Sequence, residues 1–132
     1  MAYMNSSINS SATIIDKAAT NLENAGMLAM AYTVDGKLEI ASAAGAPAIG
    51  IAISETGETV KKDDDVSVVV KDITHWRAGA AIAKGAEVMT GADGRAVPAA
   101  EGGFILGVAL EAGAADAVIP VQIVKAGYKP EA

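Results

Sequence analysis

Hydrophobic residues in this chain occur in short runs, most of them rich in alanine, valine and isoleucine, separated by glycine or by polar residues. Short apolar or alternating runs bounded by such residues are typical of β-strands. From residue 27 onward the runs follow one another at intervals of about 8 to 12 residues, which is the spacing of a β-sandwich or β-barrel. The pattern predicts a mainly all-β fold, either a small β-barrel or a β-sandwich.

The strand pattern occurs twice along the chain. Residues 30–71 contain an Asp-Gly turn, an apolar strand around Gly50 and a β-branched strand that ends in lysine, and residues 88–125 contain the same features around Gly107. A glycine inside a strand indicates a bend or the close approach of another backbone. Two similar halves could close one barrel between them or pack as two sheets, and both arrangements remain open.

Asp35-Gly36 and Asp93-Gly94 each separate two strand-like runs. An Asp-Gly dipeptide in this position is a strong signal for a hairpin, and the type I′ turn needs positive φ at both central residues. The two aspartates could instead be paired catalytic carboxylates. Their identical place before glycine in both halves favours the turn.

The N-terminal 25 residues differ from the rest of the chain. Residues 1–11 are small and polar, which predicts an arm without a core of its own. Residues 12–25 could form one short helix, because apolar residues fall at helical spacing and Gly26 would suit the helix end. Their threonine, isoleucine and asparagine content favours an extended segment about equally. The expected organisation is an arm at 1–25, a single β-domain at 26–126 and a tail at 127–132.

Composition excludes several classes of partner and site. The net charge of −6 argues against direct nucleic-acid binding, which needs clustered lysine and arginine. The 132 residues include no cysteine, so neither disulfides nor thiolate metal sites are available. No apolar run reaches the roughly 18 residues of a membrane span, and no signal peptide is expected at the start.

His75, Trp76 and Arg77 stand side by side and include the only histidine and the only tryptophan. They could form a catalytic or ligand-stacking site. A lone histidine without a nucleophile or a second ligand in motif spacing does not make a triad or a metal site. We therefore favour an anchor at the join between the halves, or a contact with a partner or another subunit, for which Trp and Arg are suited.

The remaining polar clusters predict turns and not chemistry. Asp63, Asp64 and Asp65 are consecutive, whereas an EF-hand alternates its acids and places a glycine among them. The glycine-rich stretches at 91–94 and 102–103 lack the lysine and Ser/Thr of a phosphate loop. No catalytic, cofactor-binding or metal-binding residue is assigned, and an enzyme is not expected.

The second half carries five segments that show a likeness to a known family. They are Trp76-Arg77-Ala78-Gly79, Lys84-Gly85-Ala86-Glu87-Val88, Ala92-Asp93-Gly94-Arg95-Ala96-Val97, Ile105-Leu106-Gly107-Val108-Ala109-Leu110-Glu111-Ala112 and Val118-Ile119-Pro120-Val121-Gln122-Ile123. This progression resembles the small capsid decoration, or cement, proteins of tailed bacteriophages, and the first half resembles them more loosely.

The resemblance implies a structural virion protein on the outer capsid surface. Such proteins commonly form homotrimers that bridge and stabilise the major capsid protein lattice, and the family has no catalytic residues. The candidate contact residues are His75, Trp76 and Arg77, together with Tyr3, Met4 and Ile8 of the arm, and residues 12–25 beside them. The alternative is a surface-displayed carbohydrate- or receptor-binding β-module. Aromatic residues make up only 4% of the chain, which argues against that class.

Overall fold

The computed structural model describes residues 12–53 and 58–130, and their regular secondary structure is entirely β. The all-β prediction is therefore confirmed. The strands are β1 Thr13–Lys17, β2 Leu22–Glu23, β3 Ala29–Tyr32, β4 Leu38–Ile40, β5 Gly50–Ile53, β6 Thr59–Val60, β7 Asp65–Val69, β8 Asp72–Arg77, β9 Glu87–Thr90, β10 Ala96–Pro98, β11 Phe104–Ala109 and β12 Val118–Tyr128. No helix in the described part of the chain could cross a membrane.

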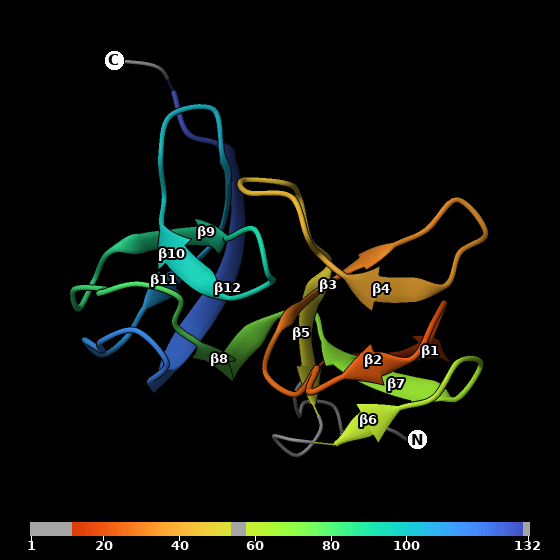
Figure 1. The fold of residues 1–132 in the computed structure, drawn as a ribbon. Coiled ribbons are helices and arrows are strands. Elements are labelled where there is room, and N and C mark those ends of the chain that lie inside the picture. Colours follow the sequence, from red (N-terminus) through yellow and green to blue (C-terminus); the bar gives the residue numbers. More distant parts are fainter. Residues whose placement is uncertain (1–11, 54–57, 131–132) are drawn as a thin grey trace, which may run out of the picture.

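The two halves of the chain form two five-stranded sheets with one topology. The strand order is β1-β7-β5-β3-β4 in the first sheet and β8-β12-β11-β9-β10 in the second, and neighbouring strands are antiparallel. Figure 1 shows the two groups of strands lying side by side. The strands β2 and β6 add a short two-stranded sheet in the first half.

Residues 12–25 contain the strands β1 and β2 and no helix, so the short helix considered for them is wrong. β1 pairs with β7 along its whole length, from Thr13 opposite Val69 to Lys17 opposite Asp65. Three β-branched residues open this strand, and such residues fit a pleated sheet better than a helix. Because β1 occupies in the first sheet the place of β8 in the second, the structural repeat begins at residue 13. At the other end of the chain, residues 127 and 128 of the expected tail lie in β12.

Each sheet curls until its two outer strands meet. Ala18, next to β1, forms a parallel bridge with Leu38 of β4, and Ala78, next to β8, forms the same bridge with Ala96 of β10. The backbone N–H of the following residue donates to the same strand in both halves, at 2.8 Å from Ala19 to the Leu38 carbonyl. Each half therefore closes a small barrel of its own, and the halves do not share a single barrel.

The second half packs on the outer face of the first sheet. The first barrel has its own core, which includes Met30, Leu38 and Val68. The core of the second barrel is continuous with first-sheet residues on the opposite face, among them Ala29 and Ile51. One hydrophobic cluster therefore spans the two halves.

The Asp-Gly turns close hairpins, as predicted, but not in the type I′ geometry. Gly36 and Gly94 have φ of 78° and 84°, whereas neither preceding aspartate is among the described residues with positive φ. The Gly36 N–H donates to the Thr33 carbonyl and the Thr33 N–H donates to the Lys37 carbonyl. These bonds define a three-residue loop with a type I turn followed by a left-handed glycine.

The strand glycines allow two backbones to approach each other, as the sequence predicts. A Cβ added to Gly50 would lie 2.0 Å from the Val69 carbonyl oxygen, and one added to Gly107 would lie 2.5 Å from the Gln122 carbonyl oxygen. Both glycines are therefore required for the pairing of the central strands.

Candidate functional site

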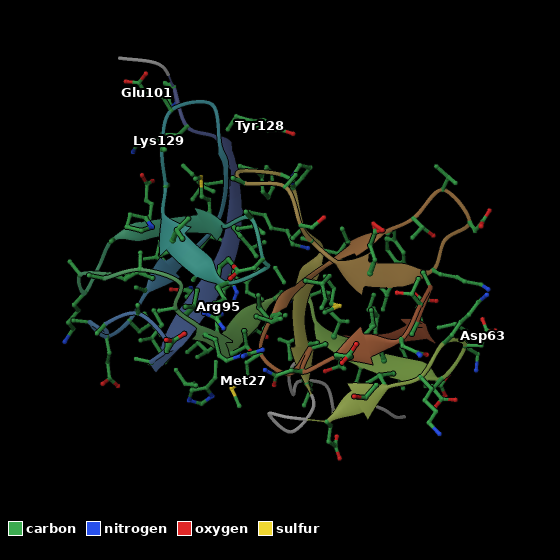
Figure 2. The ribbon with its side chains drawn as sticks, viewed as in Figure 1. Met27, Asp63, Arg95, Glu101, Tyr128 and Lys129 are labelled. Atoms are coloured by element: carbon green, nitrogen blue, oxygen red, sulfur yellow. The ribbon has the colours of Figure 1, made fainter. Side chains whose placement is uncertain are left out.

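The candidate site lies along the seam between the halves, which we define as the contact of β8 and the 91–94 turn with residues 24–29. One edge of β8 pairs with β12, and the other edge faces the first half. The backbone N–H of Arg77 donates across the seam to the Met27 carbonyl at 3.0 Å. In Figure 2, the labelled Met27 and Arg95 mark this region.

Trp76 is fully buried and ties the second barrel to the seam. Its indole Nε1–H donates to the Gly94 carbonyl at 2.8 Å. The same carbonyl accepts the Ala29 N–H of the first half at 2.9 Å. A Cβ on Gly94 would lie 2.7 Å from Ile40 Cγ2, so the 91–94 turn approaches the first sheet too closely for any larger residue.

Arg77 crosses the seam with its side chain. Nε donates to the Gly26 carbonyl at 3.0 Å, and Nη2 donates to the Asn24 carbonyl. Both acceptors belong to a turn in which Asn24 and Met27 adopt positive φ, an uncommon conformation for residues other than glycine. The guanidinium therefore holds this turn against β8.

Burial lowers the pKa of Arg77, and repulsion from Arg95 lowers it further, while Asp93 and Asp116 oppose the shift. Arginine nevertheless stays protonated at any physiological pH. Arg95 in turn forms ion pairs with Asp116 at 2.6 Å and with Asp93 at 3.6 Å. The seam therefore holds a cation whose direct hydrogen-bond partners are backbone carbonyls.

His75 is exposed and lines an open pocket of about 130 Å³ with Met27, Ala52, Ile53 and Thr74. The described lining is mostly apolar, and among the described residues His75 is its one titratable side chain. No group of three or more His, Cys, Asp or Glu able to hold a metal occurs in the described residues. The pocket thus offers a shallow apolar surface at the seam.

The structure separates the residues singled out from the sequence. Trp76 and Arg77 make their contacts inside the chain, which fits an anchor at the join, while His75 faces outward. Tyr3, Met4 and Ile8 lie outside the described residues. The sequence predicts Gly94 as part of a hairpin turn between two strand-like runs. It gives no sign that this turn contacts the first half.

Asp63 lies in an exposed turn and Asp65 follows as the first residue of β7, and both have lysine partners, in agreement with the predicted solvated turn. Lys37 Nζ lies 2.9 Å from Asp63, and Lys17 Nζ lies 2.7 Å from Asp65. The hydrogen bond from Lys37 lowers the pKa of Asp63. Figure 2 shows Asp63 at the end of the first half far from the seam.

Comparison with known proteins shows that this chain resembles a solved structure in its fold. No protein-family model matches the chain, and no curated protein matches it. A solved structure that does match is the head fibre gp8.5 N base of bacteriophage phi29, with a TM-score of 0.64 and 23% sequence identity. The match covers 91% of this chain and 99% of the other. The two proteins therefore share the whole double-barrel fold.

Proposed function

We propose that the protein is a structural component of a bacteriophage virion, and that it decorates the outer surface of the assembled capsid. The observation that carries the proposal is the fold shared with a phage head fibre base over nearly the full length of both chains. The likeness of residues 73–125 to capsid decoration proteins supports the same role independently.

The proposed partner is the major capsid protein, which the chain binds as a homotrimer. A protein that binds the assembled lattice and not its free subunits stabilises the lattice by mass action. Three linked copies, each bridging neighbouring capsid subunits, would multiply weak individual contacts through their high effective concentration. A net charge of −6 would keep many copies soluble at high local concentration.

The proposed capsid contact is the N-terminal segment 1–11. It is polar apart from a few residues that include Tyr3, Met4 and Ile8, and it directly precedes β1 at an edge of the first sheet. Trp76 and Arg77 are less suited to this contact, because the seam already uses both side chains.

A sedimentation experiment tests the proposal. The purified protein is mixed with expanded capsids assembled from the major capsid protein of the same genome and lacking decoration. Saturable co-sedimentation is expected, and deletion of residues 1–11 should weaken it while leaving the melting temperature nearly unchanged. Absence of wild-type binding would contradict the proposed function, and full binding by the deletion variant would contradict the assignment to the N-terminal segment.

The described structure gives no support to a glycan-binding platform. Among the described residues, the exposed tyrosines are Tyr32 and Tyr128, and they lie in different halves. Tyr128 contacts the ring of Phe104 edge to face, with the centroids 5.5 Å apart.

A further inference from the structure

The second sheet has an outer face that points away from its core. Partners directly opposite each other in adjacent strands share a face. Ile73 pairs with Gln122, which also pairs with Val108, and His75 pairs with Pro120. Val118 lies two residues before Pro120 on β12 and therefore points to the same side. Together these residues form what we call the β8–β12 face. It consists of Ile73, His75, Val108, Val118, Pro120 and Gln122.

The equivalent face of the first sheet is covered by the second half. The row Ala29, Ile51 and Val69 crosses β3, β5 and β7, and these residues are 0%, 0% and 4% exposed. The corresponding row in the second sheet is Glu87, Val108 and Gln122. In that row Glu87 and Gln122 are exposed and Val108 is only partly buried. Among the described residues, none covers the second row as the second barrel covers the first.

The β8–β12 face presents apolar groups and little charge to water. Ile73 is 58% and Val118 is 44% exposed. On the same side of β8, the charged residue opposite Val118 is Arg77, and it is buried against the carbonyls of the first half. At the margin, Glu87 is paired with Lys129 at 3.0 Å.

We infer that the β8–β12 face binds a second copy of this chain. The inference rests on the homo-oligomer in the proposed function and names the surface that forms it. Two copies with a net charge of −6 repel each other, so they associate most readily through a face whose own residues include no acid and whose neighbouring Glu87 is paired with Lys129. The seam shows that the outer face of this fold accepts another unit of the same fold, through Ala29, Ile51 and Val69.

Cysteine labelling tests the inference, because the chain contains no cysteine of its own. Ile73→Cys is compared with Ile15→Cys, since both isoleucines lie on edge strands and are 58% and 61% exposed. At a concentration that gives the oligomer, maleimide should label Ile73→Cys about tenfold more slowly than after dilution to monomer. The labelling rate of Ile15→Cys should not depend on concentration.

Ile73→Glu and Ile15→Glu provide a second measurement, the mass in solution by light scattering. Ile73→Glu should reduce the mass to that of the monomer with a melting temperature close to the wild type, and Ile15→Glu should keep the oligomer. A monomeric wild type would overturn the inference, as would concentration-independent labelling of Ile73→Cys or dissociation by Ile15→Glu.

Capsid co-sedimentation of the same wild-type preparation separates this inference from the proposed function. A monomer that binds capsids overturns the β8–β12 contact and leaves the capsid role standing. An oligomer that protects Ile73→Cys but ignores capsids supports the contact and contradicts the capsid role.

Discussion

Arg77 shows how the same position in a repeated fold acquires a different role in each half. Its structural equivalent is Lys17, which lies on the surface and pairs with Asp65 at 2.7 Å. Arg77 instead lies in the seam, where its fork of N–H donors reaches the Gly26 and Asn24 carbonyls. The Arg77 side chain therefore links β8 by hydrogen bonds to the turn that contains residues 24 and 26 of the first half.

Arg77→Met should destabilise the protein, because it leaves the buried Gly26 carbonyl without its donor. Loss of one partner from a buried hydrogen bond costs about 1–3 kcal/mol. Lys17→Met is the matched control and should leave the free energy of unfolding nearly unchanged, since exposed ion pairs contribute little. Urea denaturation measures both. Equal losses in the two variants would contradict the role of Arg77 in the seam.

Thr90 offers a prediction of the opposite sign. Its side chain is fully buried, and its hydroxyl has no hydrogen-bond partner in the described structure. Thr90→Val keeps the shape and removes the desolvated hydroxyl, so it should raise the stability by about 1 kcal/mol. Thermal unfolding monitored by circular dichroism should show a higher melting temperature, and a lower one would contradict this account of the site.

Some glycine positions in the two sheets can be predicted from the local sequence, whereas the pairing of distant strands cannot. The turn glycines and the strand glycines Gly50 and Gly107 are local signals: the hairpins and the close backbone approach are confirmed, while the type I′ geometry of the turns is wrong. Residues 12–25 are ambiguous in the sequence, because their apolar residues fall at helical spacing while their threonine, isoleucine and asparagine content favours an extended segment. The pairing of β1 with residues 65–69 decides the outcome, and such a distant partner leaves no mark in residues 12–25.

Gly107→Ala should break the pairing of β11 with β12, because the added methyl would lie 2.5 Å from the Gln122 carbonyl oxygen. Gly85→Ala is the control, since a Cβ there meets nothing within 4 Å and only the positive φ is strained. We expect a cost of about 1 kcal/mol for Gly85→Ala and a clearly larger one for Gly107→Ala. Similar melting temperatures would show that the close approach is not required.

In the whole molecule, the shared core and the seam join two barrels into one unit. The seam could not be predicted from the sequence because its acceptors are the backbone carbonyls of residues 24, 26, 27 and 94. Backbone groups have no sequence signature, so Trp76 and Arg77 stood out by composition while their partners did not. The sequence predicts that Trp76 and Arg77 lie at the join between the halves. Only the fold shows which carbonyls their side chains contact.

The two halves should unfold together, because one hydrophobic cluster includes residues from both. Calorimetry should therefore give a single transition whose calorimetric and van't Hoff enthalpies agree. Arg77→Met should lower the temperature of the transition and broaden it, because the variant weakens the coupling between the two barrels. Two resolved transitions in the wild type would mean that the seam does not couple the barrels.

We propose that this double barrel sits on the outside of a phage capsid, and electron cryomicroscopy of reconstituted particles can reveal that position. Undecorated expanded capsids are imaged with and without a saturating amount of the protein. We predict added density on the outer surface at symmetry-related positions, into which two adjacent five-stranded barrels fit. Identical reconstructions with and without the protein, or added density only on the inner surface, would contradict it.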